Sequence, residues 1–173
     1  MKKILLAFLC LCLLLCAASC GAPDRYDMTE QTFFYTMTTI QMFPENYVGK
    51  AISYDCFTYI LTDVDGKEYP CGVRKCSAGY GCNCGKDTII GFVLDYDGEI
   101  PAPKNQSEDS ADKTWIHLEG TLPNADKEEI RIYAYNGDQI DYGTVETVVF
   151  YHFTVDSLSL IEDYSGLNYY VTK

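Results

Sequence analysis

The chain has 173 residues, which suits a signal segment followed by one domain of ordinary size. Hydrophobic residues make up 47% of the chain and charged residues 22%, a balance that excludes a disordered or fibrous protein for most of its length. Thirteen basic residues stand against 25 acidic ones, a net charge of −12. Because so acidic a chain repels phosphate backbones, we expect no nucleic-acid partner.

Residues 1–19 have the layout of a secretory signal peptide. Two lysines precede an apolar run at residues 4–15, which is too short for a stable membrane span, and small residues follow at 17–19. These small residues, directly before Cys20, resemble a bacterial lipoprotein lipobox. The resemblance implies that Cys20 becomes the lipidated N-terminus and holds an extracytoplasmic protein at the bacterial membrane. The alternative is a plain signal peptide and a secreted product.

Cleavage before Cys20 would change both charge and cysteine content. It removes two lysines and no acidic residue, so the net charge goes from −12 to −14. Beyond the anchor the mature chain keeps Cys56, Cys71, Cys76, Cys82 and Cys84. An odd number of cysteines cannot all pair within one chain, so at least one is free, metal-bound or intermolecular.

A short polar tether, residues 20–27, precedes a single domain at residues 28–173. The segment Asp27-Met-Thr-Glu30 fits a capping box, and apolar residues recur from there at helical spacing until Pro44. We therefore predict a helix over this stretch, although its threonines favour a strand.

The chain reads as β-strands after Gly49. In a strand over residues 52–60, every second side chain would lie on one face: Ile52, Tyr54, Cys56, Thr58 and Ile60. Asp65-Gly66 then supplies a hairpin turn into a second strand. With a three-residue loop, Cys56 would lie opposite Cys76. Pro70 places the second strand at an edge or a bulge. Further strands are predicted at 88–96, 114–122, 129–135 and 145–160, a pattern typical of a small barrel or sandwich.

Several short motifs together resemble one family. They are Phe43-Pro-Glu-Asn-Tyr-Val-Gly-Lys50, Arg74, a Cys-rich turn with Asp87 and Gly91, and Thr114-Trp-Ile-His-Leu-Glu-Gly-Thr-Leu122. They are similar to the C-terminal domain of the YcgQ-like permease-subunit proteins, whose pattern is Tyr-x-Gly-Lys, an Arg, Cys-Cys-x-x-Asp and Trp-x-x-x-x-Gly.

The resemblance covers about residues 28–161. It implies a mainly β fold, a small OB-like antiparallel barrel of about five strands with an N-terminal helix. It also implies work beside a membrane permease and cysteines that handle metal. The chain departs from the pattern in three ways. Asn83 separates Cys82 from Cys84, the interval from Arg74 to Cys84 is longer than in the family, and the expected lipid anchor stands in place of the family's N-terminal membrane helices.

The glycine-rich turn after Arg74 is the candidate metal site. We predict that Cys82, Cys84 and Asp87 converge there, with Cys76 as the fourth ligand. Thiolates suit zinc or copper(I), and a glycine-rich backbone can wrap an ion. The alternative is that two of these cysteines form a disulfide that staples the loop, since no Cys-x-x-Cys pair with zinc-finger spacing is present.

The two histidines offer a second candidate site. His117 shares a strand face with Trp115, and His152 lies on another strand, so Trp115, His117 and His152 are the candidate binding face. A strand histidine is more often simply hydrogen-bonded. The Asp-x-Asp-Gly segments at 63–66 and 95–98 lack the distal Glu of a calcium loop and are expected to be turns.

The functional prediction is a binding module and not an enzyme. We find no nucleophile elbow and no Ser beside a convincing His and Asp pair. The sequence predicts a membrane-anchored extracytoplasmic lipoprotein that binds a soft metal such as zinc or assists a permease. The alternative is a structural or adhesive surface domain whose cysteines only staple loops and whose tyrosines contact a partner.

Overall fold

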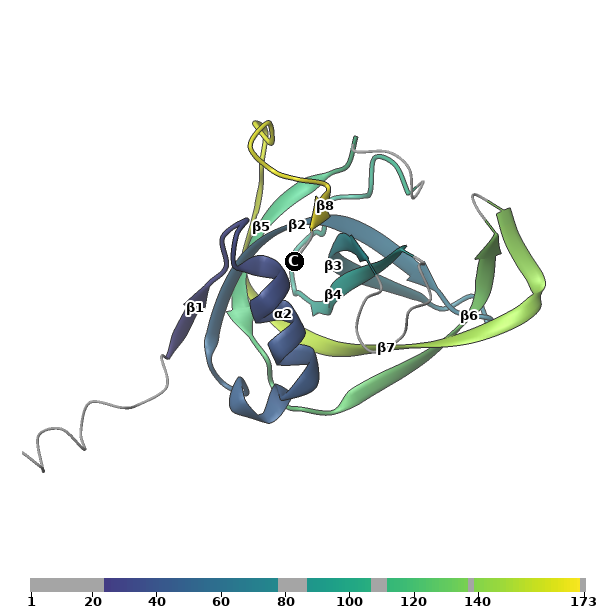
Figure 1. The fold of residues 1–173 in the computed structure, drawn as a ribbon, viewed down its shortest axis with the longest axis horizontal. Coiled ribbons are helices and arrows are strands. Elements are labelled where there is room, and N and C mark those ends of the chain that lie inside the picture. The colour runs from purple at the N-terminus through teal and green to yellow at the C-terminus, as the bar shows by residue number, and fades with distance from the viewer. Residues whose placement is uncertain (1–23, 78–86, 107–111, 137–138, 172–173) are drawn as a thin grey trace, which may run out of the picture.

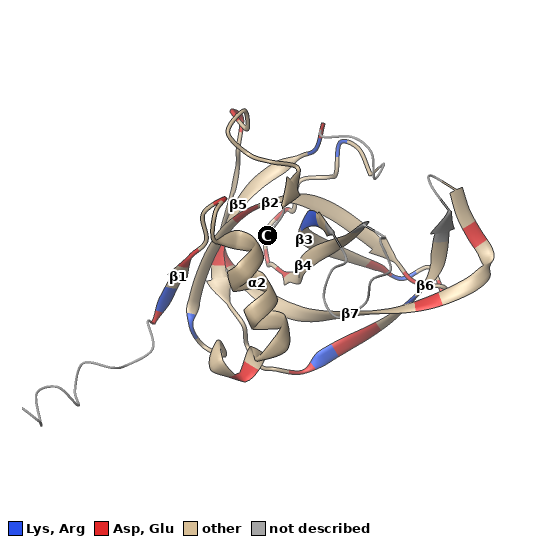
Figure 2. Ribbon diagram, in the orientation of Figure 1, with Lys and Arg blue, Asp and Glu red and all other residues tan. Residues whose placement is uncertain are grey.

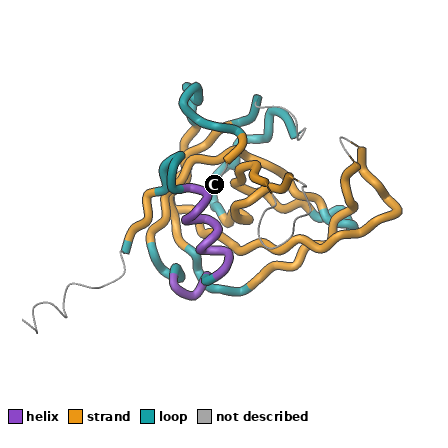
Figure 3. Tube along the Cα trace, in the orientation of Figure 1, coloured by secondary structure: helices purple, strands orange, loops and turns teal. Residues whose placement is uncertain are grey.

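The computed structural model describes residues 24–77, 87–106, 112–136 and 139–171. The protein is mainly β, as predicted, with one α-helix near its N-terminal end (Figures 1 and 3). Its elements are β1 (Arg25–Asp27), α2 (Phe33–Met42), η1 (Pro44–Asn46), β2 (Ala51–Thr62), β3 (Glu68–Ser77), β4 (Asp87–Asp95), β5 (Trp115–Thr121), β6 (Lys127–Asn136), β7 (Gln139–Leu160) and β8 (Tyr170–Val171).

The strand pairings form a closed circuit. β2 pairs with β5, β5 with β7, β7 with β4, β4 with β3, and β3 again with β2. Only the β4–β7 pair in this circuit is parallel. β1 adds to β2, β8 adds to β3, and β6 runs along β7. The described sheet therefore has eight strands, three more than the circuit itself and more than the sequence predicted.

Side chains from all five circuit strands meet α2 in one core. The helix contributes Phe33, Met37 and Ile40, which recur every three or four residues and are fully buried. Opposite them, the ring of Phe153 lies 5.7 Å from that of Tyr54. Burying such a side chain stabilises a fold by about 1.5–3 kcal/mol. Packing therefore holds the helix despite the low helix propensity of its threonines.

A second apolar cluster covers the opposite face of β2, β3 and β5. Phe57, Val73 and Trp115 lie in it together with side chains of β6 and β7. The C-terminal segment closes over them, because Tyr164 stacks on Trp115 at 6.2 Å and Tyr169 packs on Phe57 at 5.5 Å. Trp115 is consequently buried.

The predicted capping box is wrong, because its residues bind β2 and Arg74 instead of capping the helix. Residues 25–27 pair with β2, and the Met28 N–H donates to the Ser53 carbonyl at 2.8 Å. The Glu30 carboxylate binds Arg74. The helix begins only at Phe33, after Thr32, whose side chain does not cap it.

The β2–β3 hairpin has a five-residue loop, 63–67, and not the three-residue loop predicted. The Asp63 carboxylate organises this loop by accepting the N–H groups of Asp65 (2.9 Å) and Lys67 (2.8 Å). Thr62 therefore lies opposite Glu68, and Phe57 opposite Val73. The predicted opposition of Cys56 and Cys76 is wrong by this shift of register.

Pro70 lies where a missing N–H has least effect. The residue opposite it, Ile60, directs its own N–H to Gln106 Oε1 at 2.8 Å, away from β3. Pairing of β3 with β4 starts only at Cys71. The predicted edge or bulged strand is therefore wrong for β3 as a whole, which pairs with β2, β4 and β8. Among the described strands, Pro70 itself has β2 alone as a neighbour, so its missing N–H interrupts no pairing with β4.

Strand β7 is longer than predicted and extends beyond the circuit. It begins at Gln139 and has 22 residues. Within the described part of the chain, residues 139–151 of β7 pair only with β6. These two strand segments, 127–136 and 139–151, form a projecting hairpin that we name the β6–β7 arm (Figure 1).

Candidate functional site

Two of the four predicted metal ligands lie outside the described residues. Cys82 and Cys84 both fall there. Asp87 begins β4, where its backbone pairs with Ser77 of β3. Cys76 directly precedes Ser77 and pairs with Thr88. The Cys76 side chain is buried in the main core. The register thus brings the backbones of Cys76 and Asp87 to one end of the β3–β4 pair, and the convergence of the four side chains stays a prediction.

The described ranges contain no group of three or more His, Cys, Asp or Glu side chains placed to hold a metal ion. In the same ranges, no helix has the length and hydropathy needed to cross a membrane.

Two further cysteines are buried thiols. Cys56 lies on β2 opposite Ile116, and Cys71 lies on β3 opposite Tyr59. Burial raises the pKa of Cys56 well above its usual value and that of Cys71 to about 12. Because the thiolate is the reactive form, these two cysteines act as small apolar side chains of the core.

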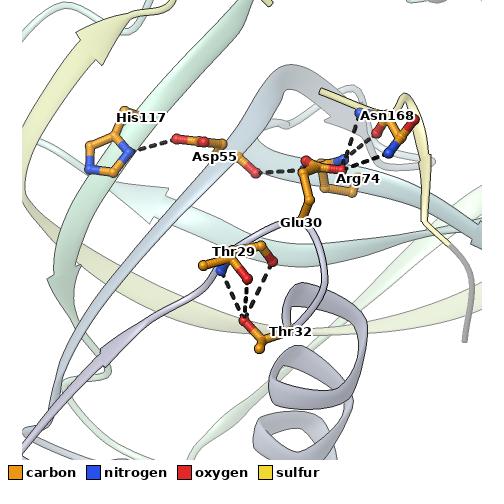
Figure 4. Close-up of polar contacts among 7 residues, drawn as sticks. All are labelled: Thr29, Glu30, Thr32, Asp55, Arg74, His117 and Asn168. Atoms are coloured by element: carbon orange, nitrogen blue, oxygen red, sulfur yellow. Dashed lines mark hydrogen bonds and ion pairs between the residues drawn. The ribbon is translucent and has the colours of Figure 1, made fainter. Parts of the chain in front are cut away.

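His117 is the centre of a polar cluster that sequence reasoning missed. Its Nδ1 lies 2.6 Å from Asp55 Oδ1 (Figure 4), and its Nε2 lies 3.3 Å from Ser53 Oγ. Asp55 is the direct partner of His117 across the β2–β5 pair, and Ser53 is two residues away on the same strand face. The alternation of Ser53 with Asp55 is the one local signal that could have indicated this face.

Ser53, His117 and Asp55 are hydrogen-bonded in the same order as a Ser-His-Asp triad, but the Ser53 hydroxyl is not accessible to a substrate. Ser53 is only 6% exposed and lies in a regular strand with β1 on one side and β5 on the other. Its own carbonyl accepts the Met28 N–H, so the backbone beside it is occupied by pairing. An acyl-transfer site needs an exposed nucleophile and N–H groups aimed at the oxyanion. We interpret the cluster as a hydrogen-bonded network.

The network continues to the edge of the sheet. His117 Nε2 is 3.9 Å from Glu119 Oε1, and this carboxylate in turn accepts a hydrogen bond from Arg25 at 2.8 Å. Arg25 also binds Asp27 at 2.7 Å. Side chains of β1, β2 and β5 are therefore linked across the outer face.

His152 belongs to a different cluster. Its Nδ1 is 3.0 Å from Asp95 Oδ2 on β4, and its Nε2 is 3.9 Å from Glu128 Oε2 on β6. His117 lies opposite Ser159 of β7, seven residues beyond His152 on that strand. At about 3.3 Å per residue, His152 is about 23 Å along β7 from Ser159, the residue opposite His117. With Trp115 buried, the structure does not bring Trp115, His117 and His152 onto one exposed face.

Arg74 is the cation at the centre of the most buried ion pair described. Its side chain is 1% exposed, and it binds both carboxylate oxygens of Glu30, at 2.6 and 3.0 Å. It also donates to the Asn168 carbonyl, and its guanidinium lies over the rings of Phe33 (5.1 Å) and Trp115 (5.0 Å). We call Arg74, Glu30 and Asn168 the Arg74 clasp (Figure 4).

The clasp is ionised at neutral pH. Burial alone would raise the pKa of Glu30, but the hydrogen bonds and charge of Arg74 outweigh burial and lower it. Asn168 adds to this effect, since its N–H and its Nδ2 donate to Glu30 Oε2 at 3.2 and 3.1 Å. The clasp thereby ties the residues before α2 and the C-terminal segment to β3. Of its members, the sequence pointed only to Arg74.

The β6–β7 arm carries the most exposed apolar surface on the sheet. Val145, Val149 and Ile140 are exposed, and Tyr142 is 71% exposed. The ring of Tyr142 packs edge-on against Tyr133 at 5.1 Å, next to the register shift between Tyr133 and Ala134. Exposed apolar residues on a two-stranded hairpin that projects from the sheet are typical of a surface that contacts another molecule.

Comparison of the chain with protein-family models, with curated proteins and with solved structures found no match.

Proposed function

We propose that the protein is a membrane-anchored extracytoplasmic lipoprotein that acts as a binding module. Its scaffold is an OB-like barrel, and the β6–β7 arm is the surface that contacts its partner. The exposed apolar arm is the observation that carries this proposal. The lipobox-like residues before Cys20 support the anchor.

The closed pairing circuit supports an OB-like barrel. An OB-fold is a five-stranded Greek-key barrel, and the circuit β2-β3-β4-β7-β5 joins five strands in a cyclic order with one parallel contact. The helix α2 packs against the inner side of all five strands. In this arrangement the β6–β7 arm is an elongated connection between the last two barrel strands.

The arm suits a partner that pairs a strand with the edge of β7 or packs an apolar surface against its exposed side chains. Among the described strands, only β6 pairs with β7 between residues 139 and 151, and we propose that the partner adds a strand along the other edge by β-augmentation. The exposed side chains of Val145 and Val149 lie beside that edge. A second copy of this chain would bring a net charge of −14 against −14, so we commit to a different protein with a neutral or basic surface.

The position of the arm restricts where the partner lies. The arm projects on the opposite side of the molecule from β1, where the tether enters (Figure 1). The partner is therefore an extracytoplasmic protein or domain that stands above the bilayer. The soluble part of a permease complex, which the family resemblance implies, fits this description.

Site-specific photo-crosslinking in intact cells tests the arm. A crosslinker at Val149 should yield one adduct, and the additional substitution Val145→Lys should abolish it by removing apolar contact and repelling a basic partner. With the purified partner, Val145→Lys should weaken binding about tenfold, which corresponds to about 1.4 kcal/mol. A crosslinker at Leu160, which is exposed on β7 outside the arm, is the matched control.

The outcomes separate the candidate partners. An adduct of twice the mass of the chain would replace the proposed partner by a second copy. An equal adduct from Leu160 would contradict a specific role of the arm. Tyr142→Ser removes the exposed ring of the Tyr133–Tyr142 pair. If this variant loses partner binding while Val145→Lys keeps it, the result would favour the structural or adhesive alternative, in which tyrosines contact the partner.

Soft-metal binding is the second part of the proposal. We propose zinc at Cys82, Cys84 and Asp87 with Cys76, because these residues lie in and beside one glycine-rich turn between β3 and β4. When bound, zinc would cross-link the connection between these strands. Protein purified without reductant should contain about one zinc or copper per chain, lost in Cys82→Ser/Cys84→Ser and weakened in mild acid, where thiolates protonate. Oxidised thiols without metal would contradict it.

A further inference from the structure

We infer that the end of the molecule formed by α2 and η1 rests on the lipid surface, with Met42, Phe43 and Val48 entering the membrane interface. The inference depends on the lipid anchor of the proposed function. It adds an orientation of the domain that the anchor alone does not determine.

Three exposed apolar side chains lie together in sequence around η1. Met42 is 55% exposed, Phe43 46% and Val48 38%. The backbone around Phe43 is held by hydrogen bonds from its N–H to Thr39 (2.9 Å) and from Asn46 to its carbonyl (3.2 Å). Its ring is thus presented from an ordered turn.

The helix that leads to this turn is uncharged. No residue of α2 is acidic or basic (Figure 2). Its buried side, with Met37 and Ile40, fills the core, and Met42 lies on the side left exposed. A helix that is buried on one side and uncharged on the other can lie on the membrane interface without moving a charged side chain out of water.

The tether enters the domain beside this surface. The Asp24 carbonyl accepts the Ala51 N–H at 3.0 Å, and its carboxylate binds Lys50 at 2.7 Å, two residues after Val48. The rings of Tyr26 and Tyr47 meet at 4.8 Å. Asp24 and η1 therefore lie at the same end of the molecule.

The length of the tether limits how far this end can stand from the lipid. Cys20 precedes Asp24 by four residues. Since an extended residue spans at most about 3.6 Å, Asp24 lies within about 14 Å of the lipidated residue. The polar layer on each side of a bilayer is itself about 5–7 Å thick. The end of the molecule that carries Asp24 and η1 is then held close to the headgroups.

Several charges around this surface are paired within the protein, but the side chain of Glu45 in η1 is exposed. Lys50 binds Asp24, and Arg25 binds Asp27 and Glu119. The exposed Glu45 carboxylate opposes the apolar contact of Met42, Phe43 and Val48, so this contact should weaken as the fraction of anionic lipid rises and recover as salt is added.

Depth-dependent fluorescence quenching tests the orientation. The lipidated full-length Phe43→Trp protein is placed in phosphatidylethanolamine–phosphatidylglycerol vesicles that contain brominated lipid, and Leu160→Trp is the control. Leu160 lies opposite Ile116, at the other end of β5 from Thr121, the partner of Ala51. Native Trp115 is buried and present in both proteins. We expect quenching roughly twofold greater at position 43 than at 160, because only position 43 reaches the acyl boundary.

The anchor is tested separately with Cys20→Ala. Release of this variant from the membrane fraction is the expected result, because the apolar contact alone binds weakly. A processed variant that stays on the membrane would contradict the lipid anchor and with it the inference. If Cys20→Ala is released but positions 43 and 160 are quenched equally, or neither is quenched, the anchor stands and the proposed orientation is wrong.

Discussion

Replacing Glu30 by glutamine should lower the free energy of unfolding by about 3 kcal/mol, because it leaves the Arg74 charge buried without its counter-ion. Arg74 is 1% exposed, so water cannot replace the carboxylate. Glu30 itself is partly exposed, which places the expected loss at the lower end of the range for buried pairs. Chemical denaturation monitored by circular dichroism measures the change.

The Lys104–Asp112 pair is a matched control for burial. Its atoms are also 2.6 Å apart, but both side chains are more than half exposed. Asp112→Asn should therefore change stability by less than about 1 kcal/mol. Equal losses in Glu30→Gln and Asp112→Asn would show that burial of Arg74 does not determine the effect.

The clasp also predicts the direction of a pH dependence. Because folding lowers the pKa of Glu30, its contribution to stability is fully present above the pKa that the carboxyl has in the unfolded chain. It is lost as the pH falls through the lower pKa of the folded state. The stability difference between wild type and Glu30→Gln should accordingly shrink in acid. A difference that stays constant down to pH 2 would contradict the ionised clasp.

Replacing Gly120 by alanine should destabilise the protein by about 3 kcal/mol or prevent folding, because it places a methyl group on β5 where β7 leaves no room for one. A Cβ at this position would lie 2.1 Å from the Thr154 carbonyl oxygen and 2.8 Å from the Phe153 ring. The register shift between Glu119 and Gly120 occurs at this crossing. Relief would require the two strands to separate.

Gly166→Ala is the corresponding control, since a Cβ there has no neighbour within 4 Å. Its stability should stay within about 0.5 kcal/mol of wild type. Thermal unfolding of both variants gives the comparison. A Gly120→Ala protein as stable as Gly166→Ala would mean that the β5–β7 crossing is looser than the structure describes.

Turns and strands could be predicted because their signals are local. The alternation from Ile52 to Ile60 and the Asp65-Gly66 turn are read within a few residues, and the structure has β2 and a hairpin loop there. The loop length was wrong because it depends on the Asp63 side chain, which accepts two N–H groups of the loop. A three-residue loop and a five-residue loop are both compatible with an Asp65-Gly66 turn.

The polar clusters could not be predicted in the same way. His117 and Asp55 are 62 positions apart, and Asn168 and Glu30 are 138 apart. Nothing in the residues around either position specifies which strand will lie opposite. The polar faces on β2 and β5 could be recognised singly, but their contact required the register of the pair.

By itself, the sequence determined the mainly β character of the protein, the approximate position of its strands and its strong acidity, since these follow from residue type and local alternation. Only the tertiary structure decided that Glu30 binds Arg74 instead of capping the helix, that Trp115 is buried, and that β7 continues into an arm. The physical reason is competition. Each such side chain or strand has several possible partners of similar local quality, and the burial of the whole core selects among them.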